Sequence, residues 1–136
     1  MAVVELGPAD ADAAVALWQS TGLTRPWNDA HADFARAVAG PSSVVLGLRL
    51  ADRLVGTAMV GHDGHRGWVY YLAVAPSAQG GGLGRELMGA CERWLAERGI
   101  PKLQFMVRTD NAGVLAFYDH LGYQQQDVVV LGRRLD

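Results

Sequence analysis

Four glycines within five positions separate an apolar run from a long amphipathic segment, and this feature constrains the fold most strongly. The loop reads Gln79-Gly80-Gly81-Gly82-Leu83-Gly84-Arg85. The run before it, Trp68 to Val74, predicts a strand, and Leu83 to Arg98 carries apolar residues at helical spacing and ends at Gly99. Lys102 to Arg108 predicts the next strand. Such a strand–helix–strand crossover predicts two parallel strands in one sheet.

The rest of the chain predicts a mixed sheet with helices on both faces. Apolar runs bounded by turn residues predict strands at residues 2–6, 43–50 and 54–60, and helices from Asp10 or Asp12 to the residue before Gly22, at 29–39 and at 111–121. Tyr123 to Leu135 predicts one or two closing strands. The order β-α-α-β-β-β-α-β-α-β(-β) therefore predicts an α/β (α+β) fold in a single domain, residues 1–136.

Composition and charge limit the partners. Hydrophobic residues make up 50% of the chain and charged residues 19%, as in a folded globular protein rather than a disordered one. A net charge of -2 provides no basic footprint for nucleic acid or for an anionic membrane surface. We therefore expect a small molecule or a peptide as the partner.

The same features favour a cytoplasmic location. Residues 1–5 lack the basic start and apolar run of a signal peptide, and no apolar stretch reaches the roughly 20 residues of a membrane helix. The single cysteine, Cys91, cannot form an internal disulfide, which fits a reducing compartment. Because Cys91 shares a helical face with Leu87 and Trp94, we expect a buried core thiol rather than a nucleophile.

The glycine-rich loop suits a phosphate or pyrophosphate, because glycines let backbone N–H groups turn inward at the positive end of a helix dipole. Three phosphate motifs compete for it. A P-loop would need Lys and Ser/Thr where the chain has Arg85 and Glu86. A dinucleotide fingerprint would need a glycine at Leu87 and an acidic residue near Gln104. The third motif, Gln/Arg-x-x-Gly-x-Gly/Ala, fits residues 79–84 at every position.

Two motifs together resemble the GCN5-related N-acetyltransferase (GNAT) superfamily. The loop motif follows residues 72–76, whose Leu-x-Val-x-Pro spacing belongs with it. Asn111 to Tyr123 is similar to the pattern Asn-x-x-Ala/Val-x-x-Phe/Leu-Tyr-x-x-Leu-Gly-Phe/Tyr near the end of that fold. The resemblance covers about residues 43–123. Gly61 to Tyr71 and Leu131 to Leu135 look like small bacterial members of the YpeA type.

The resemblance implies acetyl-CoA as the cosubstrate and most of its binding site. The strand at Leu72 to Val74 would splay from the strand at Lys102 to Arg108 and expose backbone groups to the pantetheine, while the loop would hold the pyrophosphate. The residues implied to bind the cosubstrate are Leu72, Ala73, Val74, Gln79, Gly80, Gly81, Gly82, Leu83, Gly84, Arg85, Asn111 and Tyr118. Core packing of Leu72 and Val74, a solvated Arg85 and a helix cap at Asn111 stay open as alternatives.

Acyl transfer from a thioester to an amine needs a neutral amine, a donor for the oxyanion and an acid for the departing thiolate. A backbone N–H of the splayed strand would serve as the oxyanion donor. Tyr118 stands where the family places its acid, and a phenol with a pKa of about 10 can donate to a thiolate. A buried structural tyrosine would fit the same helix.

The general base is open. The candidates are Tyr70 acting through water, Asp63, His62 and His65, or an amine that arrives neutral. In ribosomal-protein N-terminal acetyltransferases of the superfamily a glutamate precedes the Val-Arg of the late strand, and Met106 stands there in this chain. This departure disfavours acetylation of protein N-termini.

The His62–His65 segment also raises the question of a metal. Three ligand-type residues lie within four positions, but no fourth ligand is evident, so we expect a turn stabilised by Asp63 and Gly64 and no metal. Trp27, Phe34 and Tyr70 are candidate walls of the acceptor pocket, and core packing explains Phe34 equally well.

We therefore expect an N-acetyltransferase that moves the acetyl group of acetyl-CoA to a primary amine of a small molecule or peptide, by direct attack in a ternary complex. The alternative is a non-catalytic acyl-CoA binding or sensing domain. The apolar segment Asp127 to Leu135 would pair across a homodimer, and burial within the monomer would explain it equally well.

Overall fold

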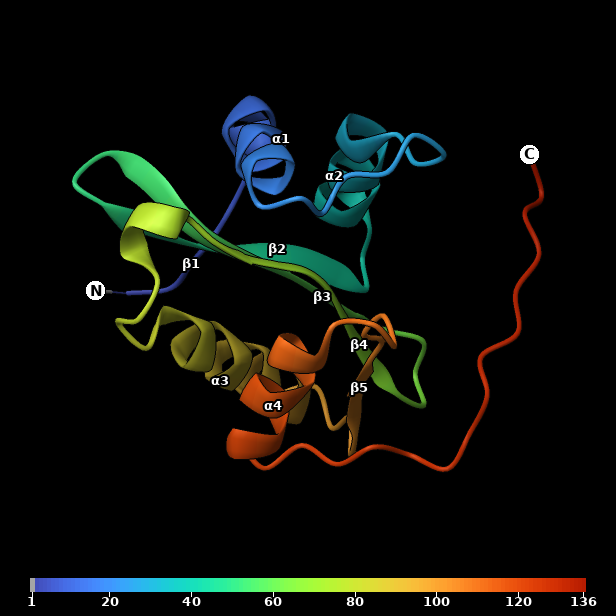
Figure 1. Cartoon of the computed structure of the whole chain (residues 1–136). Coiled ribbons are helices and arrows are strands. Elements are labelled where there is room, and N and C mark those ends of the chain that lie inside the picture. Colours follow the sequence, from blue (N-terminus) through green and yellow to red (C-terminus); the bar gives the residue numbers. More distant parts are fainter. Residues whose placement is uncertain (1) are drawn as a thin grey trace. The chain divides into compact units, whose positions relative to one another are not determined.

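A five-stranded mixed sheet with helices on both faces forms most of the molecule. The structure, a computed structural model, describes residues 2–136 (Figure 1). Its elements are β1 (Val4–Glu5), η1 (Pro8–Asp10), α1 (Ala11–Ser20), α2 (Ala30–Ala39), β2 (Ser43–Leu50), β3 (Arg53–His62), β4 (Gly67–Val74), η2 (Pro76–Ala78), α3 (Leu83–Ala96), β5 (Leu103–Phe105) and α4 (Ala112–His120). Contacts divide the chain into two compact units, Met1–Met106 and Val107–Asp136, which are described separately.

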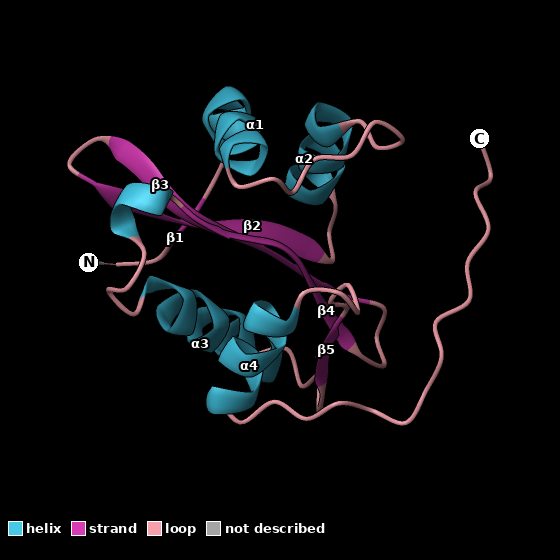
Figure 2. Cartoon of the chain, viewed as in Figure 1, coloured by secondary structure: helices cyan, strands magenta, loops and turns pink. Residues whose placement is uncertain are grey.

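The sheet of the first unit confirms the predicted topology. Its order is β1-β2-β3-β4-β5, with antiparallel pairing throughout except between β4 and β5, which run parallel. In Figures 1 and 2, α1 and α2 cover one face of the sheet and α3 covers the other. The α3 helix is the crossover between the two parallel strands, so the α/β fold class predicted from the glycine-rich loop is confirmed.

The parallel strands separate early, as the prediction of a splayed pair requires. Pairing joins only Gly67–Val69 to Leu103–Phe105. The β4 strand then continues from Tyr70 to Val74, where it pairs with β3 alone among the residues that the structure describes. The strand predicted over 102–108 is thus only three residues long.

The buried face of α3 carries the single cysteine. Cys91 is fully buried among the apolar residues of the core, including Leu87 and Leu95. Burial raises the pKa of the Cys91 thiol to about 12, because the charged thiolate is poorly solvated there. The prediction of a core thiol is confirmed.

We accordingly expect Cys91 to resist alkylation in the folded protein. A thiol reacts as its thiolate, so the folded chain should react with iodoacetamide at pH 8 at least about a thousandfold more slowly than the chain in guanidinium chloride. Mass spectrometry of timed samples measures both rates. Full labelling of the native protein at the unfolded rate would contradict the burial.

The predicted closing strands are wrong. In the second unit α4 is followed by an irregular chain, and residues 123–136, all of them described, form no strand. Val128 to Leu131 are between 62% and 90% exposed, so burial within the monomer does not explain their apolar character. A β-branched run becomes a strand only when another strand accepts its backbone hydrogen bonds, and the sequence pattern does not supply that partner.

Among the described residues, no helix is both long and apolar enough to cross a membrane.

Candidate functional site

The glycine-rich loop leads into α3 with its backbone uncovered. Gly80 and Gly82 adopt positive φ angles of 88° and 79°, which glycine tolerates because it has no Cβ. Gly82 is the N-cap of α3, and the first bond within the helix runs from the N–H of Glu86 to the carbonyl of Gly82 (3.1 Å). The N–H groups of residues 83–85 precede that bond, and Gly82 has no side chain to accept from them.

In two other helices, the side chain of the N-cap residue accepts a hydrogen bond from the first helical turn. At the start of α2, Asp29 accepts from the N–H of Ala32 (3.0 Å), and at the start of α4, Asn111 accepts from the N–H of Val114 (3.3 Å). The start of α3 therefore combines backbone donors with a positive helix end, which is the arrangement that binds phosphate groups.

Gln79 ties this loop to the end of β4. Its Nε2 donates to the carbonyl of Val74 (3.1 Å). The N–H of Ala75 donates to the carbonyl of Val55 in β3 (2.8 Å), and successive residues of a strand turn their backbone groups to opposite edges. Val74 thus presents its backbone to the edge that β5 has left. Ala73 is buried and Arg85 is exposed.

A bulge interrupts β4 where it leaves β5. Residues 57 and 59 of β3 pair with residues 73 and 70 of β4, so Tyr71 and Leu72 together oppose Ala58. Tyr71 has a φ of 52°, a left-handed conformation that costs a non-glycine residue about 1–2 kcal/mol. The bulge also changes the face of the sheet to which side chains point. Gly67 and Tyr71 are four residues apart, so in a regular strand both would face α3. A Cβ on Gly67 would indeed overlap Leu95 of α3, but Tyr71 contacts α1 on the other face.

Three contacts hold Tyr71 in this conformation. Its ring stacks on Trp18 of α1, with centroids 3.8 Å apart and planes 13° apart. Its hydroxyl donates to Asp33 of α2 (2.7 Å), and its carbonyl accepts from the hydroxyl of Thr57 (2.9 Å). Trp18 Nε1 in turn donates to the Thr57 hydroxyl (2.8 Å). Net stabilisation of roughly 1 kcal/mol per hydrogen bond, with the stacking, offsets the backbone strain.

These residues were missed by the sequence analysis. The signal was one polar residue, Thr57, inside the apolar run that became β3, because a buried hydroxyl needs a hydrogen-bond partner. The pattern does not reveal that the partners come from α1 and β4.

The aromatic candidates for the acceptor region differ in exposure. Trp27 is 54% exposed and Tyr70 is 44% exposed, whereas Phe34 is buried against Trp18 with ring centroids 6.0 Å apart. Phe34 is therefore a core residue. Burial raises the pKa of the Tyr70 hydroxyl, so this group stays protonated at neutral pH and would act on an amine by hydrogen bonding through water, not as a phenolate.

The histidine-containing segment between β3 and β4 is a turn, as expected. The Asp63 carboxylate accepts from the N–H groups of Arg66 (2.8 Å) and His65 (2.9 Å), and both bonds lower its pKa. Gly64 donates to His62 Nδ1 (3.0 Å) and has a φ of 87°. These bonds close the turn locally.

The remaining predicted site residues belong to the second unit. Asn111 caps α4 through its Oδ1, so the predicted helix cap is confirmed, while the predicted contact of Asn111 with CoA stays a prediction. Tyr118 is half-buried in α4, and its ring contacts those of Phe117 and Tyr123 edge-on, at 5.1 Å and 6.0 Å between centroids. The acid role of Tyr118 stays a prediction.

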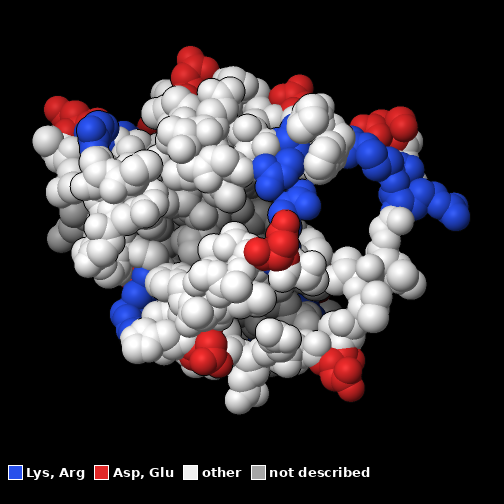
Figure 3. All heavy atoms as spheres, viewed as in Figure 1, with Lys and Arg blue, Asp and Glu red and all other residues white. Residues whose placement is uncertain are grey.

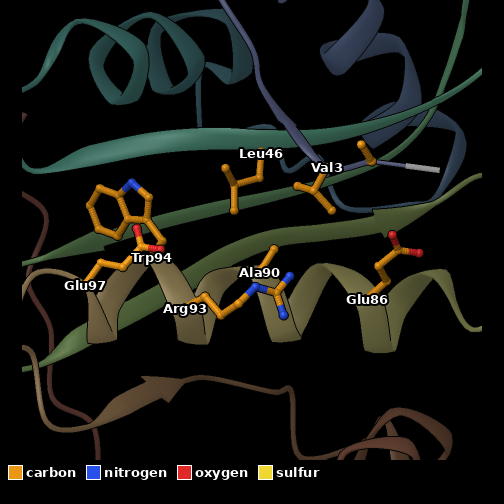
Figure 4. Close-up of a pocket in the computed structure, with 8 residues that line it drawn as sticks. Val3, Leu46, Glu86, Ala90, Arg93, Trp94 and Glu97 are labelled. Carbon is orange, nitrogen blue, oxygen red and sulfur yellow. The ribbon is translucent and has the colours of Figure 1, made fainter.

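A cavity of about 390 Å³ lies between α3, Leu46 of β2 and the start of the chain (Figure 4). Its lining residues are Ala2, Val3, Leu46, Glu86, Ala90, Arg93, Trp94 and Glu97. None of them belongs to residues 72–74 or 79–85, so this cavity is separate from the candidate cosubstrate site. In Figure 3, acidic side chains lie scattered and basic ones in small groups among uncharged residues.

Sequence comparisons identify related proteins. The sequence signature of the acetyltransferase (GNAT) family matches residues 11–123. Acetyltransferase YE1169 of Yersinia enterocolitica is 40% identical over 127 residues, which are 93% of this chain and 90% of that protein. An acetyltransferase of Yersinia pestis is 40% identical over 126 residues, 93% of this chain and 89% of its own length.

Solved structures share the fold at low sequence identity. The aminoglycoside N-acetyltransferase AAC(6')-Iy in complex with CoA has a TM-score of 0.84 at 14% identity, covering 99% of this chain and 95% of its own. The aminoglycoside antibiotic 6'-N-acetyltransferase AAC(6')-IG from Acinetobacter haemolyticus has a TM-score of 0.80 at 17% identity and covers both chains fully.

Proposed function

The chain belongs to the acetyltransferase (GNAT) family, and from this premise we propose that it transfers the acetyl group of acetyl-CoA to a primary amine of a small molecule or peptide. One observation carries the proposal: the uncovered N-terminus of α3, entered through Gly80 and Gly82, follows directly on the open edge of β4. A pyrophosphate at the first and a pantetheine along the second would account for both features.

The reaction we propose is direct transfer in a ternary complex. The neutral amine nitrogen attacks the thioester carbonyl, a C–N bond forms, the C–S bond breaks, and the oxyanion accepts a hydrogen bond from a backbone N–H of β4. Tyr118 gives its proton to the departing thiolate, and the proton of the amine leaves to water, with Tyr70 as the candidate that orients this water. A proton from water then restores the Tyr118 hydroxyl. Loop residues 79–85 and Asn111 hold the cosubstrate.

The finer placement of the chain within its family is also a proposal. Segments 61–71 and 131–135 support the YpeA type, and Met106 in place of a glutamate argues against protein N-termini as acceptors. We include aminoglycosides among the candidate acceptors because two proteins of the same fold are named aminoglycoside acetyltransferases. Polyamines, amino acids and peptides are the others.

Thiol release from acetyl-CoA in the presence of these amines tests the function. We expect at least one class to give saturable release above the hydrolysis rate, with a product heavier by one acetyl group. Double-reciprocal plots at several amine concentrations should intersect, because direct transfer needs both substrates bound together, whereas an acetyl-enzyme would give parallel lines. Binding of acetyl-CoA without release on any amine would contradict the proposal.

A further inference from the structure

We propose that Thr57 is a positioning residue for acetyl transfer: it holds the bulge at Tyr71 and thereby aims the Leu72 N–H, at the start of the open β4 edge, toward the acetylated end of CoA. The inference rests on the proposed function, because it concerns the same edge of β4. Thr57 itself is fully buried and would touch neither substrate.

The Thr57 hydroxyl makes two hydrogen bonds beside the bulge. It accepts from Trp18 Nε1 (2.8 Å) and donates to the carbonyl of Tyr71 (2.9 Å). Trp18 is fully buried and stacks on the Tyr71 ring, so the donor and the bulge are held by the same helix. The hydroxyl therefore fixes one peptide plane, the one that follows Tyr71.

The planar trans peptide carries this constraint to Leu72. The carbonyl of Tyr71 and the N–H of Leu72 belong to one peptide unit and point in opposite directions. Because Thr57 draws the carbonyl toward itself, the Leu72 N–H points away from the hydroxyl. Without that bond the strained φ of Tyr71 could relax, and the peptide plane would turn.

The peptide between Tyr71 and Leu72 lies at the part of β4 where the cosubstrate would bind, so its orientation would affect acetyl transfer. Pairing with β5 ends at Val69, and the bulge follows two residues later, so the Leu72 N–H lies where the strand has lost its parallel neighbour. The glycine-rich loop lies at the other end of the open edge, after Val74. A cosubstrate with its pyrophosphate in that loop would extend along β4 toward the bulge, which would then receive the thioester and the developing oxyanion.

Thr57→Val and Thr57→Ser separate this role from packing. Valine keeps the branched shape but loses both hydrogen bonds, and serine keeps the hydroxyl. We expect Thr57→Val to lower kcat about 10- to 100-fold, while the Kd of CoA, which the loop largely sets, stays within about threefold. Thr57→Ser should recover kcat to within about threefold of the wild type. All rates are measured well below each variant's Tm, so that lost stability does not enter.

Amide NMR supplies a readout that does not need turnover. Titration with acetyl-CoA should shift the Leu72 N–H in the wild type and in Thr57→Ser, and much less in Thr57→Val. If the wild type releases no thiol with any amine but shows this pattern, the proposed function fails, whereas the inference that Thr57 aims the Leu72 N–H at bound acetyl-CoA stands. A Thr57→Val variant with wild-type kcat and wild-type Leu72 shifts overturns the positioning role, as does a loss that serine does not rescue.

Discussion

Replacing Gly82 with aspartate is expected to raise the Kd of CoA about 100-fold or more. The change has two effects at the start of α3. A Cβ at a φ of 79° costs about 1–2 kcal/mol, and a carboxylate at the helix end competes for the N–H groups of residues 83–85 and repels a pyrophosphate. Loss of charged hydrogen bonds, each contributing about 1.5–3 kcal/mol, accounts for the factor. Calorimetric titration with CoA measures it.

Gly99→Asp is the matched control. Gly99 follows the same helix at its other end and has a φ of 73°, so the strain and the added charge are nearly equal, but no phosphate is expected there. We expect this variant to bind CoA like the wild type, with a fall in Tm at least as large, because a carboxylate opposes the helix dipole at this end. Equal loss of binding in both variants would mean that helix stability, not the anion site, explains the result.

The parts of this molecule that could be predicted from the sequence are those specified by neighbouring residues. The loop at residues 79–85 lies between a strand and a helix whose patterns are strong, and a crossover of this kind allows only a parallel pair. The same logic predicted the strands at residues 43–50 and 54–60, which are β2 and β3, and the burial of Cys91. Each of these conclusions uses residues within one or two adjacent elements.

What the sequence did not predict depends on contacts between distant residues. Thr57 bonds to Trp18, 39 positions away, and Tyr71 bonds to Asp33, 38 positions away. A strand pattern has a period of two residues, so it does not indicate an inserted bulge residue or a left-handed φ at a tyrosine. The same limit explains the error at residues 123–135: strand propensity alone predicted strands there, but no partner strand pairs with them.

Removing the hydroxyl of Tyr118 is expected to have the largest effect on turnover. If this phenol protonates the leaving thiolate, Tyr118→Phe should lower kcat about 10²- to 10⁴-fold, which is the usual contribution of a general acid. Binding of CoA should change little, because the loop and the open β4 edge are unaltered. Stopped assays of thiol release and calorimetry with CoA give the two numbers.

Tyr123→Phe is the control variant for Tyr118→Phe. The Tyr123 ring packs against the Tyr118 ring, and the substitution likewise removes one phenolic hydroxyl. It should keep kcat within about threefold of the wild type. A more acidic leaving group needs less protonation, so an acetyl thioester of a more acidic thiol should be impaired less by Tyr118→Phe than acetyl-CoA is. Equal impairment with both thioesters, or equal loss in both tyrosine variants, would assign Tyr118 to the packing of α4, and the thiolate would then have to leave unprotonated or take its proton from water.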